Sequence, residues 1–324
     1  MAGSTGKRLS PESLRVIGAF VFAALLHCMG ILVIDGYGSL FALRSMLILA
    51  SLLAIASVGQ TLVVIIGGID LSIPFLIGFA NVVAAQLHGD GMNFGLVCAL
   101  VLVMSFAIGM ANGAISQGLG IHPLIVTLGT GTIAEGSVLL WTNGSPSGSA
   151  PDAVSAFVSI GGSIGPLPFP WLVPCFIVLA VLIILALART PYGRRLYALG
   201  SNPTAAPLAL IRPLLLWSVT FGASAVFAAV AGVLLLGFTG SAYGDVGQPY
   251  LFQTIAAVVI GGTALVGGRG SYLGTIGGAL VLTELNTLLI GIGLQAAAVQ
   301  TALGIVIVAL VSFYGREPHV RTTI

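Results

Sequence analysis

The chain has 324 residues, of which 57% are hydrophobic and only 6% are charged, and its formal net charge is +2. Soluble domains normally carry about a quarter of charged residues, so this composition excludes a soluble globular protein. It also lends no support to nucleic-acid binding, since membrane topology accounts for the few basic residues.

Ten apolar segments are suited to cross a bilayer as helices, because about 20 helical residues span a hydrocarbon core of about 30 Å. The segments lack the alternation of a membrane barrel. The predicted spans are residues 16–34, 45–66, 72–87, 94–115, 124–141, 171–188, 214–238, 251–266, 272–290 and 295–314. Segment 72–87 is the best candidate for a short or re-entrant helix, so eight spans are the alternative. The prediction is an all-α, polytopic membrane protein with one transmembrane domain over residues 1–324.

Basic residues gather on one side of this predicted topology. With a cytoplasmic N-terminus, the residues inside are Lys7, Arg8, Arg15, Arg189, Arg194, Arg195, Arg212, Arg269, Arg316 and Arg321, and Arg44 alone is outside. Cytoplasmic loops are enriched in Lys and Arg. Both terminal tails, residues 1–15 and 315–324, are therefore predicted to be cytoplasmic.

The 45 glycines indicate tightly packed helices, because small residues let helix backbones approach each other in a bilayer. Four-residue spacing suggests contact faces at Gly109 and Gly113, and at Gly270, Gly274 and Gly278. Two glycine pairs interrupt apolar stretches and predict helix breaks, which are common along transport pathways: Gly67-Gly68 and Gly261-Gly262.

Two connecting segments are longer than the others. Residues 142–170, predicted outside, are rich in Gly, Ser and Pro, and we expect either a flexible connector or a docking surface for an extracytoplasmic partner. Residues 189–213, predicted inside, contain Ser201-Asn202-Pro203, a turn that can cap a short helix over 204–211. That helix is too short to span and too apolar to face only water, so it should lie on lipid headgroups or dock into a partner.

Few polar side chains fall inside the predicted spans. The candidates for lining a pathway are Gln60, Asn81, Glu135, Gln253, Glu284 and Asn286. A charge near the bilayer centre costs about 2.5–3.5 kcal/mol on insertion scales, so Glu135 and Glu284 should be protonated, hydrogen-bonded or in contact with water. A structural hydrogen bond between helices is an equal alternative for each. Asp70 lies behind two glycines near a span end, where backbone amides could bond its carboxylate, and we predict a structural role for it.

The sequence contains no motif that indicates catalysis or the binding of a nucleotide or metal ion. There is no G-x-x-x-x-G-K-[ST] phosphate loop, and the four histidines lack metal-site spacing. We therefore predict no catalytic residue, no metal and no cofactor on this chain.

Five motifs occur in order along the chain: GGIDLS at 67–72, Asn112-Gly113, Thr127-Leu128-Gly129, TPYGRRLYALGSNPTAA at 190–206, and AAVVIGGTALVGGRGSYLGTIGGA at 256–279. Each motif is short, but together they resemble permease subunits of bacterial ABC importers for monosaccharides. These permeases are the ribose, xylose and arabinose type of the branched-chain permease superfamily.

The resemblance implies a type II importer permease fold in the bacterial cytoplasmic (inner) membrane. It implies a pathway for a monosaccharide delivered by a periplasmic sugar-binding protein, a separate ATP-binding cassette subunit that holds ATP and Mg, and a second permease, either a copy or a paralogue. Matches to the loop motif imply that coupling to the ATPase involves Tyr197, Ala198, Gly200, Asn202, Ala205 and Ala206.

The chain departs from these motifs at two places. Ala209-Leu210-Ile211 stands where Ser-Gly-Ile is usual, and Ile73-Pro74-Phe75 stands where Val-Gly-Ser is usual. Two other functions stay open: an ion- or proton-coupled secondary transporter with Glu135 and Glu284 as proton carriers, and an ABC permease for branched-chain amino acids.

Overall fold

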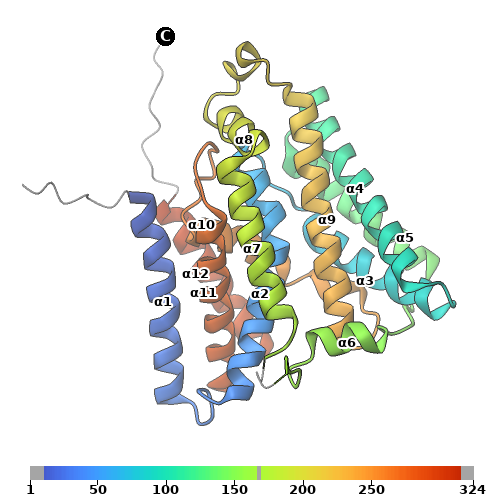
Figure 1. Cartoon of the computed structure of the whole chain (residues 1–324), viewed down its shortest axis with the longest axis vertical. Helices are drawn as coiled ribbons and strands as arrows, with labels where there is room; N and C mark the ends of the chain where they lie inside the picture. Colours follow the sequence, from blue (N-terminus) through green and yellow to red (C-terminus); the bar gives the residue numbers. More distant parts are fainter. Residues whose placement is uncertain (1–10, 166–168, 315–324) are drawn as a thin grey trace, which may run out of the picture.

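The computed structural model describes residues 11–165 and 169–314, which form a bundle of helices (Figure 1). The tails that carry Lys7, Arg8, Arg316 and Arg321 lie outside the described residues. In chain order the α-helices are α1 (Pro11–Val33), α2 (Leu40–Ile65), α3 (Ile73–Gly89), α4 (Phe94–Leu119), α5 (Pro123–Trp141), α6 (Asp152–Val158), α7 (Leu172–Arg189), α8 (Pro191–Ser201), α9 (Pro213–Thr239), α10 (Tyr250–Ile260), α11 (Tyr272–Gly291) and α12 (Ala296–Tyr314). Two 3-10 helices in the described part are η1 (Ala206–Ala209) and η2 (Gly244–Gly247).

Each of the ten predicted spans coincides with a helix. In the described part of the chain, seven helices are long and apolar enough to cross a membrane: α1, α2, α4, α5, α7, α9 and α11. Helix α3 has 17 residues and is short, as predicted for segment 72–87. Helix α10 has only 11 residues and ends at Ile260, so the predicted span 251–266 was too long. The reason is Gly262, whose φ of 84° belongs to the left-handed region that ends helices.

The chain contains two similar sets of helices in opposite orientation. Helices α2 and α9 run in opposite directions, and each is followed by an extended segment, a short helix and two further helices (Figure 1). The sets are interlocked: α3 and α4 pack against α9, and α10 and α11 pack against α2. Inverted repeats of this kind occur in many transporters, where the substrate site lies between the repeats.

Glycines allow the closest contacts between these helices. A side chain at Gly109 or Gly113 of α4 would overlap backbone carbonyl oxygens of α9, and one at Gly274 or Gly278 of α11 would overlap those at the end of α10. The predicted face of Gly109 and Gly113 is therefore confirmed, and the predicted face of Gly270, Gly274 and Gly278 is confirmed for its last two glycines only. Gly270 precedes α11 and does not belong to its face.

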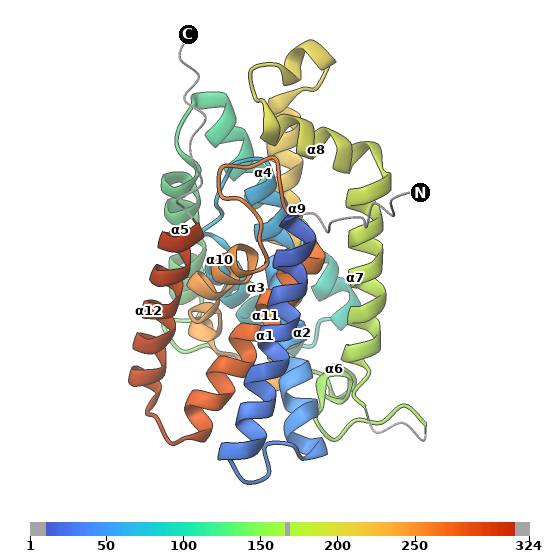
Figure 2. The same cartoon turned by 90° about the vertical axis from the view of Figure 1, so that its left-hand side faces the viewer.

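Helix α8 and the segment after it lie at one end of the bundle, which we call the α8 end (top of Figure 1). Helix α1 begins and α12 finishes at this end, whereas α6 lies at the opposite end (Figures 1 and 2). The described chain thus starts and finishes at the same end of the bundle, which agrees with the predicted even number of crossings. The Arg44 guanidinium lies at the opposite end, where it donates to the carbonyl oxygen of Ile160 at 3.5 Å.

Candidate functional site

Helix α8 is fastened to both glycine-rich motifs. The Tyr197 hydroxyl donates to the carbonyl oxygen of Gly270 at 2.8 Å. The amide of Gly268 donates to the carbonyl oxygen of Ile65, at the end of α2, also at 2.8 Å. We call residues 65–68, 197–201 and 267–270 the α8 junction. It joins the end of α2, helix α8 and the loop before α11, which are far apart in sequence.

Backbone contact at the α8 junction depends on glycine. A side chain at Gly200 would overlap the carbonyl oxygen of Ile65 and the amide of Gly268. Gly67 and Gly262 have φ of 85° and 84° and end α2 and α10 with equivalent turns. Both glycine pairs therefore end a helix, as the sequence predicted.

The segment 202–212, which we call the 202–212 loop, projects beyond the bundle at the α8 end (Figure 1). The predicted cap is present, because Oδ1 of Asn202 accepts from the amide of Ala205 at 2.9 Å. The predicted helix over 204–211 is wrong in extent, since only the 3-10 helix η1 forms. Prolines at 203 and 207 remove amide donors, and Leu210 has a φ of 57° that a right-handed helix cannot include.

Two leucines of the 202–212 loop point away from the protein. Leu208 is 87% exposed and Leu210 is 91% exposed, whereas Ala206 between them and α8 is buried. Exposed apolar side chains on a projecting loop are suited to contact with a partner or with lipid headgroups. The left-handed φ of Leu210 also explains why the related motif has glycine at this position.

A buried polar network lies between α3, α4, α5 and α9. The carboxylate of Asp70 accepts from the amide of Ser72 at 2.9 Å and from the hydroxyl of Ser224 on α9 at 2.7 Å. The Asn112 amide on α4 donates to the Ser72 hydroxyl at 3.2 Å, and its carbonyl accepts from Thr130 on α5 at 2.6 Å. The network thus joins the GGIDLS motif to the Asn112-Gly113 motif. A separate hydrogen bond joins the GGIDLS motif to the Thr127-Leu128-Gly129 motif, because the amide of residue 71 donates to the Thr127 hydroxyl at 3.0 Å.

The segment 240–249 lies directly on α3. The amide of Tyr243 donates to Oδ1 of Asn81 at 2.9 Å, and Nδ2 of Asn81 donates to the carbonyl oxygen of Gly232 on α9 at 3.3 Å. A side chain at Gly78 would overlap the carbonyl oxygen of Gly244. Asn81, a candidate for the pathway, therefore holds the segment that leads into α10.

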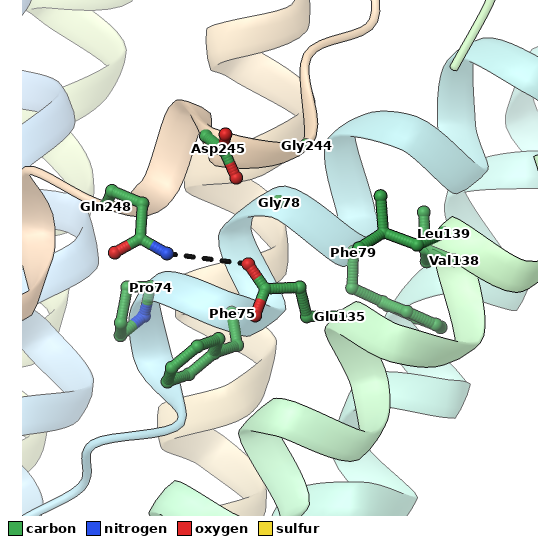
Figure 3. A pocket seen from close by; sticks show the side chains of 10 residues that line it. All are labelled: Pro74, Phe75, Gly78, Phe79, Glu135, Val138, Leu139, Gly244, Asp245 and Gln248. Carbon is green, nitrogen blue, oxygen red and sulfur yellow. Dashed lines mark hydrogen bonds between the residues drawn. The ribbon is translucent and has the colours of Figure 1, made fainter. Parts of the chain in front are cut away.

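A pocket opens between α3, α5 and η2 (Figure 3). Its lining residues are Pro74, Phe75, Gly78, Phe79, Glu135, Val138, Leu139, Gly244, Asp245 and Gln248. The amide of Gln248 donates to a carboxylate oxygen of Glu135 at 3.5 Å. Pro74 lies in the first turn of α3, whose N-terminus carries a partial positive charge that favours nearby carboxylates. Glu135 is the one candidate pathway residue in this pocket.

Glu284 lies elsewhere, between α11 and α1. Its carboxylate accepts from the Tyr37 hydroxyl at 2.9 Å and lies 3.2 Å from Nδ1 of His27. Helix α1 is at the edge of the bundle opposite α5 (Figure 1). The structure therefore does not bring Glu284 together with Glu135.

The other candidate pathway residues also lie apart from the pocket. Gln60 on α2 is fully buried, and neither its Nε2 nor its Oε1 has a hydrogen-bond partner among the described residues. Gln253 on α10 and Asn286 on α11 are half-buried. Within the described ranges, no three His, Cys, Asp or Glu side chains gather closely enough to hold a metal ion.

Sequence reasoning missed Phe75, Phe79, Asp245 and Gln248 of the pocket. Asp245 and Gln248 lie outside the predicted spans, and the two phenylalanines resembled ordinary apolar residues of a span. The proline at position 74, noted as a departure from the motif, marked the start of α3 beside the pocket.

A family model described as branched-chain amino acid transport system / permease component matches residues 42–311. The chain is 35% identical over 239 residues to the ribose import permease protein RbsC of Haemophilus influenzae, which covers 73% of both chains. It is 32% identical over 280 residues to the autoinducer 2 import system permease protein LsrD of Klebsiella pneumoniae, covering 84% of this chain and 83% of the relative. It is also 32% identical over 295 residues to LsrC of Photorhabdus laumondii, covering 90% of this chain and 87% of the relative. No solved structure matches the chain.

Proposed function

The chain belongs to the family of branched-chain amino acid transport system permease components, and from that premise we propose that it forms the translocation pathway of an ATP-driven importer for a monosaccharide such as ribose, or for autoinducer 2. The chain is a multi-pass permease of the ABC importer class and not an enzyme. ATP and Mg are then bound by a separate ATPase subunit, and the solute crosses chemically unchanged.

The observation that carries this proposal is the exposure of Leu208 and Leu210 on the 202–212 loop. Two large apolar side chains in water are unfavourable by about 1.5–3 kcal/mol each compared with burial. We infer that they are covered by a groove on the ATPase subunit. The loop is suited to transmit force, because Ala206 is buried and Asn202 caps the turn.

The α8 junction provides a short route from the docking loop to the pocket. A displacement of α8 would move the end of α2 and the loop before α11, because Tyr197 and Gly200 contact them. Only residues 66–72 separate α2 from α3, and Pro74 in the first turn of α3 lines the pocket. ATP binding to the partner subunit is thereby linked to the pocket through the contacts of the α8 junction.

This function fixes the orientation of the chain. The α8 end faces the cytoplasm of a bacterial inner membrane, and the opposite end, with α6, faces a periplasmic binding protein. A second permease, either a copy or a paralogue, completes the pathway.

The separation of the two acids argues against a proton-driven carrier. A relay between Glu135 and Glu284 would need them on one path, but Glu284 bonds to Tyr37 and His27 at the opposite edge from α5. The acids therefore favour the importer over a secondary transporter.

The test measures ATPase association and uptake together. The tagged chain is co-expressed with a candidate ABC ATPase subunit, purified, and reconstituted with its binding protein to measure ATP-driven uptake of ribose and of autoinducer 2. Ala205→Glu and Leu208→Glu should abolish association and uptake without changing the amount of inserted protein. The matched control for association is Ala153→Glu, at an exposed position of α6 at the opposite end, which should leave the ATPase bound. Uptake by the chain alone that follows a proton gradient would overturn the proposal.

A further inference from the structure

The pocket between α3, α5 and η2 is lined on one side by hydrogen-bond acceptors. Two carboxylates, of Glu135 and Asp245, and the amide of Gln248 face it (Figure 3). The bond between Gln248 and Glu135 is 3.5 Å long, at the limit for a hydrogen bond. Among the described residues, the Asp245 side chain has no hydrogen-bond partner. Most of the acceptor sites in the pocket are therefore free for a donor from a bound molecule.

The other side of the pocket is aromatic. Phe79 is buried and Phe75 is half-buried, with its ring against Gly131 of α5. Glycine at 131 leaves room for this ring, because a side chain there would overlap it. Apolar and aromatic walls with a few placed polar groups are typical of small-molecule sites. The ring faces suit the C–H surface of a compact solute.

The charge of the pocket selects against anions. Its lining includes two acids and no Lys, Arg or His. A carboxylate or phosphate in the pocket would meet like charge without a cation to offset it, which is unfavourable. A neutral molecule with several hydroxyl donors has no such penalty.

We propose that this pocket is a solute-contacting subsite for a neutral polyhydroxylated molecule, with Glu135, Asp245 and Gln248 accepting from its hydroxyls and Phe75 and Phe79 covering its apolar face. The inference rests on the proposed function, and it adds which residues of the chain determine the choice of solute. A branched-chain amino acid could place its ammonium group near the two acids, but its carboxylate would find no cation here and its side chain has no hydroxyl to donate. Asp245 and Gln248 are exposed, so the subsite is open to a solute on the side of η2.

The first experiment measures protection of the pocket by a solute without ATP. In a variant with Cys28, Cys98 and Cys175 replaced by alanine, Leu139→Cys is introduced on α5, at a 45% exposed position of the pocket lining, and its labelling rate by uncharged N-ethylmaleimide is measured. Saturating neutral pentoses (ribose, arabinose or xylose) should slow labelling about fivefold, while ribose 5-phosphate and leucine at the same concentration should not. The control is Ile133→Cys on the same helix, which is 69% exposed and outside the pocket lining, and which no solute should protect.

The second experiment reverses the charge. Glu135→Lys should let ribose 5-phosphate slow labelling at position 139 about fivefold, because the new cation pairs with phosphate, and should abolish protection by ribose. Glu135→Gln should keep protection by ribose, because an amide still accepts from hydroxyls. Should the cysteine-free chain fail to fold, the thermal unfolding midpoint of the unaltered chain, with ribose and with ribose 5-phosphate, gives the same comparison, and only ribose should raise it.

Three results would overturn the inference: no protection by any neutral pentose, equal protection by ribose 5-phosphate in the Leu139→Cys variant, or equal protection at position 133. These results are independent of the importer proposal. Failure of ATPase association with intact pentose protection would reject the importer and leave the subsite, and the opposite combination would reject the subsite alone.

Discussion

The hydroxyl of Tyr197 on α8 donates a hydrogen bond to the backbone carbonyl oxygen of Gly270, 2.8 Å away, across 73 residues of sequence. Helix α8 leads into the 202–212 loop, and Gly270 lies directly before α11. One side-chain contact thus joins α8, which precedes the proposed docking loop, to the loop that leads into α11. Its removal should disturb coupling more than folding.

Tyr197→Phe should lower the rate of ATP-driven uptake several-fold while the ATPase stays bound and active. The change removes one hydrogen bond, worth about 1 kcal/mol, so the thermal unfolding midpoint should fall only slightly. The matched control is Tyr192→Phe on the same helix, because its hydroxyl bonds to α9 and not to the glycine-rich loop. The Tyr192 hydroxyl lies 3.0 Å from that of Thr220, and burial raises its pKa. Equal loss of uptake in both variants would mean that the hydroxyls serve stability alone.

Gly200→Ala should prevent the α8 junction from forming. The added methyl group would overlap the carbonyl oxygen of Ile65 and the amide of Gly268, neither of which can rotate away. We expect little folded protein, measured as the monodisperse fraction after detergent extraction. Gly18→Ala on α1, where the methyl group would meet no atom within 4 Å, should fold normally. Normal yield of Gly200→Ala would show that α8 is not held against α2.

Much of the architecture followed from local sequence. The lengths of the apolar segments predicted the helices, and the pairs Gly67-Gly68 and Gly261-Gly262 predicted the helix breaks. A glycine with a left-handed φ ends a helix through local geometry, which the sequence reveals. The helix over 204–211 was mispredicted because apolar content outweighed the prolines at 203 and 207. The pocket could not be predicted, since Glu135 and Gln248 are 113 residues apart and only tertiary packing brings them together. For Asp70, a structural role was expected from backbone amides, but the Ser224 hydroxyl on α9 is a partner that no local pattern reveals.

Ser224→Ala should destabilise the protein by about 1–3 kcal/mol. The hydroxyl of Ser224 is a donor to the buried carboxylate of Asp70 at 2.7 Å, and its loss leaves an acceptor oxygen without that bond. The measurement is the thermal unfolding midpoint in detergent. Ser218→Ala on the same helix removes only a bond to the carbonyl of Leu214 within α9 and should change the midpoint little. Equal midpoints for the two variants would contradict the importance of the network.

Leu210→Gly should separate backbone strain from docking. A left-handed φ of 57° costs leucine about 1–2 kcal/mol, which glycine avoids, while glycine also adds entropy to the unfolded chain. The unfolding midpoint should therefore stay equal or rise slightly. Association with the ATPase should weaken, because a 91% exposed apolar side chain is lost. A large fall in the midpoint would show that Leu210 packs against the protein and is not available to a partner.

Gln60→Met tests the one fully buried amide that lacks any partner among the described residues. An unpaired buried polar group costs about 1–3 kcal/mol, and methionine has nearly the same length and shape. If Gln60 meets polar partners only in another state of the transport cycle, the variant should have a higher unfolding midpoint and a lower uptake rate. A lower midpoint would instead reveal a buried water that satisfies the amide in the resting protein. A higher midpoint with unchanged uptake would remove Gln60 from the pathway, so the two measurements together decide its role.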